Sequence, residues 1–469
     1  MVYSLLIISR FYHYERSIPC RNLITIPGKT AQYLLSNICA KLLDYLNKII
    51  NSEKFLNQHR SKPTYFTRKR KLPFNTIIAF MLSLVRGSYQ NELDRFFKLL
   101  DNHNTIKRVV SKAAFTKARI KLKYQAFIEL NYKLVEFFEK HFDLKTWNGF
   151  RLLAVDGSTV RLPYSDDIKE HFGFWKNPRG KRCPMARICQ LFDPLNKITI
   201  DALISPVNIG ERRLATNLFL RLMPRDLLLM DAGYPAFWLF TLLLSLNAHF
   251  CVRLYKKWKI VGSFLASGAK EKIFCLPVGY GSIKTVREMG LSRKSLKLRL
   301  IRLDKGKEPI VLITSLIDSE KYPHSIFSDL YHHRWPVEED YKTIKSHIEL
   351  ENFTGKSALS VYQDFHAKIL IKNIVSVFAV SANETRVESD NSDAHKKYRY
   401  QVNFKQSMAA VKDSLPLLFQ RSKNKITRII KSLLEFMAKT LEPVRPGRSC
   451  PRIKRIASRK YFYCYKPIA

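Results

Sequence analysis

RLLAVDGSTVRL (151–162) and LLLMDAGYP (227–235) decide the fold class of this chain. Each begins with a short apolar run that leads into an aspartate with glycine close behind it, Asp156 in the first and Asp231 in the second. Runs of this length and composition predict buried β-strands. We therefore expect both aspartates at the carboxyl ends of strands, the sheet edge at which ligands bind in α/β folds.

Further strands and helices are predicted around these two stretches by the spacing of apolar residues and by turn-forming residues. The predicted strands are ARICQLFD (186–193), ITIDALISP (198–206) and HFCVRLY (249–255), and the predicted helices are ERRLATNLFLRL (211–222) and PAFWLFTLLLSLN (235–247). Residues 256–318 read as strands again, in IFCLPV, SIKTVRE, LKLRLIRL and PIVLITSLI, and predict an inserted β module. Strands that alternate with helices after an initial meander predict a mixed α/β sheet.

The composition is strongly basic. The 469 residues include 81 Lys and Arg against 39 Asp and Glu, a formal net charge of +42. Such an excess favours a polyanionic partner, and nucleic acid comes first because each neutralised phosphate releases a counterion. An anionic membrane surface is the alternative. The eight cysteines include no CxxC pair, which argues against a zinc site and fits a reducing cytoplasm.

Asp156 and Asp231 stand out in so basic a chain. A buried carboxylate without a partner is costly, and a divalent cation removes that cost because hard cations prefer oxygen ligands. The alternative is an aspartate that caps the following turn, which is the better interpretation of either residue alone. The two together favour a cation site only modestly.

A third acid lies in YHHRWPVEEDYKTIK (331–345). Tyr331, Arg334, Glu338 and Lys345 are three, four and seven residues apart, and these offsets place all four on one face of an α-helix. Pro336 predicts a kink, or a new helix with the proline in its first turn. The alternative is an amphipathic surface helix in which Arg334 pairs with Glu338, and on this segment alone the two interpretations are balanced.

Three motifs together carry a family resemblance: DGSTVRLP (156–163), DAGYP (231–235) and Y-x2-R-x3-E-x6-K (331–345). They resemble the insertion-sequence-4 family of bacterial DDE transposases, whose signature the third motif matches at every position. The likeness extends to FTRKRKLPFNTIIAFML (66–82), NIGERR (208–213), FCVR (250–253) and YQDFHAK (362–368). Each motif is weak alone, whereas the ordered set is specific.

The resemblance implies an α/β, RNase H-like catalytic core of the retroviral integrase superfamily, with a β-rich insertion and a helical N-terminal domain before it. The domains we predict are residues 1–55, unassigned; 56–148, helical and DNA-binding; 149–255, the first part of the core; 256–320, the β insertion; 321–385, the second part of the core with the catalytic helix; and 386–469, a helical and basic C-terminal region.

The function implied is that of a DNA transposase, which cuts at element ends and transfers the strands to target DNA. Asp156, Asp231 and Glu338 would be its catalytic acids and would hold two divalent cations, Mg²⁺ with Mn²⁺ as a substitute. We expect Asp156 to bridge the ions. Glu339 and Asp340 follow directly, so the choice of Glu338 rests on spacing. The alternatives are a non-mobile metal-dependent nuclease and a decayed or repurposed DNA-binding protein without activity.

Tyr331, Arg334 and Lys345 are the residues expected to bind DNA. Arginine can hold a phosphate bidentately and lysine as a point charge, while tyrosine can hydrogen-bond a phosphate or stack on a base. A core aromatic explains Tyr331 equally well. Glu211 could assist near the site, although the dipole of the helix that it begins explains an acid there too.

Two basic clusters outside the site are expected to contact phosphates with most of their residues, although a solvated helix face is the usual meaning of such runs: Arg60, Lys62, Arg68, Lys69, Arg70 and Lys71, and then Lys117, Arg119, Lys121 and Lys123. The last 25 residues form a basic tail, to which the sequence assigns no role. The expected partners are double-stranded DNA, both at the terminal inverted repeats and in the target, and a second copy in a homodimer. We expect no membrane association, and a location in the bacterial cytoplasm at the nucleoid.

Overall fold

The computed structural model of the chain describes residues 28–83, 86–101, 104–176, 182–304, 308–387, 398–419 and 423–445. The chain divides into two compact units. Among these residues, unit 1 comprises 144–158 and 187–342, and unit 2 comprises 28–143, 159–186 and 343–445, each with the gaps just given.

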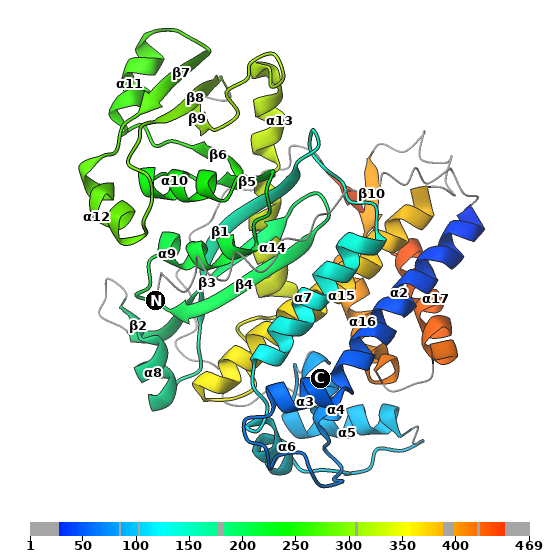
Figure 1. Cartoon of the computed structure of the whole chain (residues 1–469). Coiled ribbons are helices and arrows are strands. Elements are labelled where there is room, and N and C mark those ends of the chain that lie inside the picture. The colour runs from blue at the N-terminus through cyan, green and yellow to red at the C-terminus, as the bar shows by residue number, and fades with distance from the viewer. Residues whose placement is uncertain are drawn as a thin grey trace. The chain divides into compact units, whose positions relative to one another are not determined.

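Unit 1 is built on a mixed β-sheet, as the alternation of strands and helices predicted (Figure 1). Its strands are β1 (Arg151–Arg161), β3 (Arg182–Asp193), β4 (Ile198–Pro206), β5 (Asp226–Met230), β6 (His249–Arg253), β7 (Glu271–Leu276), β8 (Leu296–Leu303) and β9 (Ile310–Thr314). Their order across the sheet is β4-β3-β1-β5-β6-β9-β8-β7. The central strands β1, β5 and β6 run parallel, whereas β9, β8 and β7 follow as antiparallel neighbours.

The central strands are apolar because the sheet buries them. All five residues of β5 are buried, and so are the four residues from Leu152 to Val155 in β1. Strands buried on both faces read as continuous hydrophobic runs rather than as alternating ones. The two runs quoted at the outset therefore form the centre of the sheet.

The helices of unit 1 connect these strands. They are α9 (Glu211–Leu218), η2 (Phe219–Arg221), α10 (Phe237–Ser245), α11 (Lys259–Ala266), α12 (Tyr280–Glu288), η3 (His324–Ile326), α13 (Phe327–His332) and α14 (Trp335–Lys342). Pro336 is the second residue of α14, so the prediction of a new helix with this proline in its first turn is confirmed. Proline is tolerated there because the first N–H groups of a helix have no intrahelical partner.

Within the predicted β insertion, the prediction of a strand for SIKTVRE is wrong. SIKTVRE (282–288) lies in α12, and residues 259–266 form the helix α11. Ser282 and Val286 are the buried residues of α12, and their spacing of four is helical. The three strands β7, β8 and β9 continue the sheet from β6 rather than forming a separate module.

Unit 2 is mainly helical in its described part. Its elements are α2 (Gly28–Ile50), α3 (Glu53–His59), α4 (Phe74–Leu82), α5 (Tyr89–Leu100), α6 (Lys112–Arg119), α7 (Gln125–His141), α8 (Asp166–Phe172), β2 (Phe174–Lys176), the π-helical turn η4 (Thr343–His347), α15 (Ala358–Val387), β10 (Arg399–Val402), α16 (Phe404–Leu418), α17 (Lys423–Lys439) and β11 (Leu441–Val444). Helices from the predicted regions 56–148, 321–385 and 386–469 thus belong to one unit. The basic tail lies outside the described residues, apart from Arg445.

Helix α15 forms the centre of unit 2 and packs against α2, α4, α7, α16 and α17. By length and composition it could cross a membrane, but 94% of its apolar window is buried inside the protein. That burial is typical of a core helix.

Arg119, which we expected to contact phosphate, is a structural residue of this core. Its side chain is 4% exposed and forms an ion pair with Asp364 of α15 at 2.9 Å. The carboxylate in the motif YQDFHAK is therefore its partner, and the arginine is turned away from any DNA surface.

Candidate active site

Asp156 and Asp231 lie level with each other on neighbouring strands of unit 1. In the parallel pair β1 and β5, Ala154 is opposite Leu229, and each aspartate follows two residues later. Neighbouring strands are about 4.8 Å apart, so the register brings the two acids side by side. Asp231 directly follows the last residue of β5, as predicted. The prediction of a strand end is wrong for Asp156, because β1 continues to Arg161, beyond its pairing with β5. Each also has a local role, because Asp156 accepts a hydrogen bond from the N–H of Gly157 at 2.9 Å and Asp231 from that of Gly233 at 2.8 Å.

The surroundings of Asp156 disfavour its charged form. Burial raises the pKa of its carboxyl to about 7, and the negative charges of Glu211 and Asp231 add to the effect. The N–H of Gly157 and the guanidinium of Arg334 act in the opposite direction. A carboxyl with this pKa takes up or releases a proton near neutral pH, which is typical of functional sites.

Two tyrosines attach the segment of Glu338 to the backbone beside the two aspartates. The hydroxyl of Tyr331, in α13, donates to the carbonyl of Met230 at 3.3 Å, one residue before Asp231. The hydroxyl of Tyr341, in α14, donates to the carbonyl of Asp156 itself at 2.8 Å. Glu338 stands between the two tyrosines in the sequence, in the helix of Tyr341, so the two hydrogen bonds keep its segment near both aspartates.

Glu338 forms an ion pair with Arg334, with 2.7 Å between Oε1 and Nη2. The Arg334 guanidinium also lies over the ring of Tyr331, 5.7 Å from its centroid. The positive charge of Arg334 also favours the ionised form of Asp156. The buried Nε of Arg334 has no hydrogen-bond partner among the described residues. The pair that the surface-helix interpretation anticipated is thus present, but it lies at the acidic site.

Lys345 does not continue the face that Tyr331, Arg334 and Glu338 share. It belongs to the π-helical turn η4 in unit 2, where its Nζ donates to the carbonyl of Thr159 at 2.8 Å. The expectation of four residues on one helical face is therefore wrong. The helix begins anew at Trp335 and changes its pitch at Thr343, so the offsets of a regular α-helix do not apply across the segment.

Within the part of the chain that the structure describes, no three His, Cys, Asp or Glu side chains are close enough together to hold a metal ion. The donor chemistry of the site nevertheless fits a hard cation, because carboxylate oxygens are the ligands that Mg²⁺ prefers. The ion pair of Glu338 with Arg334 turns one of its oxygens towards the guanidinium.

Glu211, which the sequence offered as a residue that could assist near the site, lies beside Asp156. The carboxylate of Glu211 accepts a hydrogen bond from Tyr234 at 2.7 Å, and its negative charge adds to the burial that raises the pKa of Asp156.

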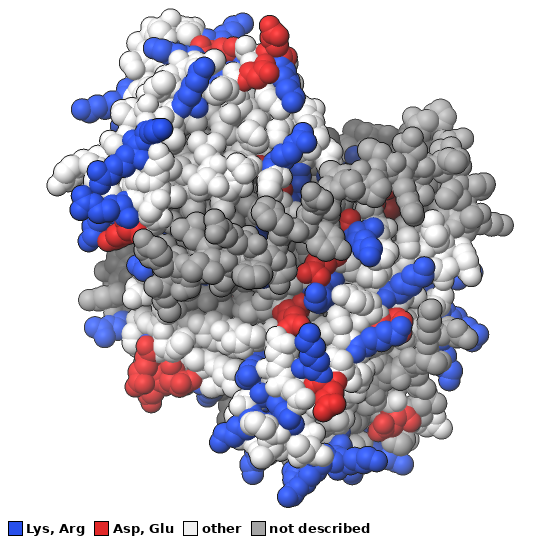
Figure 2. All heavy atoms as spheres, viewed as in Figure 1, with Lys and Arg blue, Asp and Glu red and all other residues white. Residues whose placement is uncertain are grey.

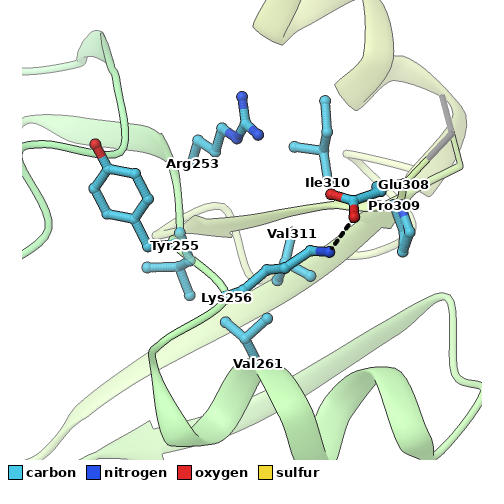
Figure 3. A pocket seen from close by; sticks show the side chains of 9 residues that line it. Arg253, Tyr255, Lys256, Val261, Glu308, Pro309, Ile310 and Val311 are labelled. Atoms are coloured by element: carbon cyan, nitrogen blue, oxygen red, sulfur yellow. Dashed lines mark ion pairs between the residues drawn. The ribbon is translucent and has the colours of Figure 1, made fainter. Parts of the chain in front are cut away.

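A pocket of about 290 Å³, which the sequence did not predict, lies at the end of β6 (Figure 3). It is lined by Arg253, Leu254, Tyr255, Lys256, Val261 and residues 308–311, and Lys256 forms an ion pair with Glu308. Burial raises the pKa of Tyr331, and the nearby charge of Arg253 acts in the opposite direction. The sequence feature that could have pointed to Arg253 is its position at the end of the strand that follows β5.

A family model described as "Transposase DDE domain" matches residues 147–374, which include all three acids. This match defines the class of the protein. Transposase InsG for insertion sequence element IS4 of Escherichia coli (strain K12) is 25% identical over 448 residues, which cover 91% of this chain and 94% of that protein. A solved piggyBac transposase synaptic complex with hairpin DNA covers 87% of this chain and 87% of its own at a TM-score of 0.43 and 11% identity, a likeness too low to support an argument.

The chain belongs to the insertion-sequence-4 family of DDE transposases, and its function is DNA transposition. The resemblance inferred from the three motifs is thereby confirmed. Proteins of this class cut and join DNA and generally use divalent metal ions.

Proposed function

We propose that this transposase cuts DNA at the ends of its element and joins those ends to target DNA, with Asp156, Asp231 and Glu338 as catalytic acids that hold two divalent cations. The observation that carries the proposal is the register of β1 and β5, which brings the two aspartates level with each other on neighbouring strands. The hydroxyls of Tyr331 and Tyr341 support Glu338 as the third acid, because they attach its segment to the backbone at Met230 and Asp156.

The ions would be Mg²⁺, with Mn²⁺ as a substitute, and Asp156 would bridge them. Bound ions of this kind activate the attacking oxygen and stabilise the departing 3′ oxygen. They would also offset the burial and the repulsion that raise the pKa of Asp156. Glu338 would turn an oxygen from Arg334 to the ions, and Arg334 would then be available to a DNA phosphate.

The reaction balances without an external energy source. In cleavage, a water oxygen bonds to phosphorus while the bond from phosphorus to the 3′ oxygen breaks, which leaves a 3′-hydroxyl and a 5′-phosphate. In strand transfer, that hydroxyl loses its proton and attacks a phosphorus of the target, whose own 3′ oxygen departs. One phosphorus–oxygen bond forms for each one that breaks.

We assign unit 1 to the RNase H-like folds, with the core formed by the predicted regions 149–255 and 321–385. The order β4-β3-β1-β5-β6, with β1, β5 and β6 parallel, supports this assignment. The predicted boundaries of the other regions remain proposals as well.

We propose that the terminal inverted repeats bind to a surface of unit 2 that two basic segments form together, one around Lys62 and the other around Lys121. The N–H of Ser61 donates to the carbonyl of Lys121 at 2.9 Å, and the ring of Tyr65 lies between the ammonium groups of Lys62 and Lys121, at 6.0 and 5.1 Å. Figure 2 shows Lys and Arg side chains gathered over this end of unit 2, where α3, α5 and α6 lie. Such a surface can neutralise several phosphates of double-stranded DNA.

Tyr331, Arg334 and Lys345 would contact the DNA near the acids, with Arg334 supplying its unpartnered Nε to a phosphate. A homodimer would pair the two element ends, and a cytoplasmic location at the nucleoid would give access to the target.

Cleavage of a DNA fragment that carries an element end tests the three acids. We expect Asp156→Asn, Asp231→Asn and Glu338→Gln each to reduce Mg²⁺-dependent cleavage by about a thousandfold or more, since metal assistance contributes several kcal/mol to the barrier. Each variant should still shift the same DNA in a gel, because the substituted side chains would hold the ions and would not themselves bind the DNA.

Glu339→Gln is the matched control, because this neighbour is exposed and pairs with Lys342. It should keep substantial activity, and equal loss in Glu339→Gln and Glu338→Gln would refute the choice of Glu338. Joining of paired ends to target DNA separates a transposase from a plain nuclease, which would cut without joining.

A further inference from the structure

Glu211 is placed against the backbone of the first catalytic acid. A methyl group added to Gly157 would lie 2.4 Å from the Cδ and 2.6 Å from the Oε1 of Glu211, closer than real Cβ atoms come to other atoms. Only glycine after Asp156 therefore leaves room for this carboxylate. The charge of Glu211 affects Asp156 more strongly than that of Asp231 does.

A hydrogen bond from a buried tyrosine fixes the position of the Glu211 carboxylate. The hydroxyl of Tyr234, which is 1% exposed, donates to its Oε1 at 2.7 Å. Arg187 lies 3.7 Å from Oε2, too far for a strong hydrogen bond. The next residue, Arg212, donates from Nε to the carbonyl of Gly233 at 2.7 Å. These hydrogen bonds of Arg212 and Tyr234 connect the motifs NIGERR and DAGYP next to the two aspartates.

Arg187 offsets the charge of Glu211 only in part at a distance of 3.7 Å. Burial and the negative charge of Glu211 both disfavour the ionised form of Asp156. A helix dipole stabilises an acid in the first turn of α9, but it requires neither contact with Gly157 nor a buried tyrosine hydroxyl. A divalent ion between Glu211 and Asp156 would account for both features.

We propose that Glu211 is a fourth carboxylate of the metal site, which supplies a ligand to the ion that Asp156 binds and which Tyr234 holds in position. This inference rests on the proposed function, because it presupposes the ions of Asp156. Tyr234 is a positioning residue in this arrangement, since its hydroxyl would act on the ion only through the carboxylate of Glu211.

Titration of Mn²⁺ into the full chain bound to element-end DNA, followed by calorimetry, tests the proposal without a turnover measurement. We expect Glu211→Gln to weaken Mn²⁺ binding about tenfold or more, because the amide keeps the shape and accepts the Tyr234 hydrogen bond but lacks the charge. Tyr234→Phe should weaken it less. Glu308→Gln, an exposed acid paired with Lys256, should leave binding unchanged.

Thermal unfolding without metal separates a ligand from a structural residue. A ligand role predicts that Glu211→Gln unfolds at the same or a higher temperature than the parent, because like-charge repulsion with Asp156 is removed. The inference is overturned if Glu211→Gln binds Mn²⁺ as the parent does while Asp156→Asn does not. It is also overturned if Glu211→Gln lowers the unfolding temperature but leaves Mn²⁺ binding intact. If Glu211→Gln and Asp156→Asn both bind Mn²⁺ as the parent does, this inference and the proposed function both fail.

Discussion

Each unit contains an arginine paired with a carboxylate, and the two pairs differ in how completely their hydrogen bonds are satisfied. In unit 2, every guanidinium nitrogen of Arg119 donates, to the side chains of Tyr89, Thr354, Gln363 and Asp364 and to the carbonyl of Ser360. In unit 1, Arg334 forms one ion pair with Glu338, and its buried Nε has no partner among the described residues.

The difference separates a structural pair from a functional one. A buried polar network that is fully satisfied makes a core rigid and specific. A buried donor without a partner costs free energy, and such a donor beside a cluster of carboxylates can gain a partner when an anion such as phosphate binds. The pair in unit 2 therefore stabilises the fold, whereas we propose that the pair in unit 1 serves to bind a ligand.

Removal of Arg119 should have the larger effect on stability. Arg119→Met leaves the carboxylate of Asp364 buried without a counter-charge, and we expect a loss of about 3–5 kcal/mol in the free energy of unfolding. Urea unfolding followed by circular dichroism measures it. The double variant Arg119→Met/Asp364→Leu should recover part of the loss, because no charge remains unpaired. An unchanged midpoint for Arg119→Met would contradict the structural role.

Removal of Arg334 should affect the DNA complex instead. A charged hydrogen bond to phosphate contributes about 1.5–3 kcal/mol, so Arg334→Ala should weaken the complex with element-end DNA by about 10- to 100-fold. Stability should change by less than for Arg119→Met, because Arg334 makes one ion pair with a side chain that is 19% exposed, whereas Arg119 donates five hydrogen bonds in the core. Gel-shift titration checks this, with Arg302→Ala as a control for lost charge. Equal affinities for Arg334→Ala and the parent would contradict its phosphate role.

The sequence was sufficient for the strands and the break at Pro336, because both depend on local properties. ITIDALISP coincides with β4, and the all-buried run before Asp231 is β5. SIKTVRE was predicted as a strand because valine and isoleucine generally favour strands. It forms a helix in the structure, and its buried residues Ser282 and Val286 are four residues apart, which is a helical spacing.

The acids of the site could be chosen from the motifs, but their surroundings could not. Tyr331 and Tyr341 bind backbone carbonyls, and a carbonyl acceptor leaves no trace in the sequence. Lys345 was placed with Arg334 by regular helical offsets, which the π-helical turn interrupts. The fit of Glu211 to Gly157 depends on two elements far apart in the sequence.

The pH dependence of ion binding follows from the raised pKa of Asp156, about 7 against an ordinary 3.8. Without metal, the folded state keeps a proton that the unfolded state has lost, so this residue's contribution to stability is full below about pH 4 and falls as the pH rises to about 7. Metal requires the ionised carboxylate, so the affinity for cations changes in the opposite direction.

Calorimetric titration of Mn²⁺ into the full chain with element-end DNA, at pH 6 and at pH 8, is the most direct measurement of whether Asp156, Asp231 and Glu338 bind metal together. A carboxyl with a pKa of about 7 is about one-tenth ionised at pH 6 and nine-tenths at pH 8, so we expect two ions, bound about tenfold more tightly at pH 8. Asp156→Asn, Asp231→Asn and Glu338→Gln should each lose at least one of them. Binding that is absent, or that none of the three substitutions alters, would contradict the metal site.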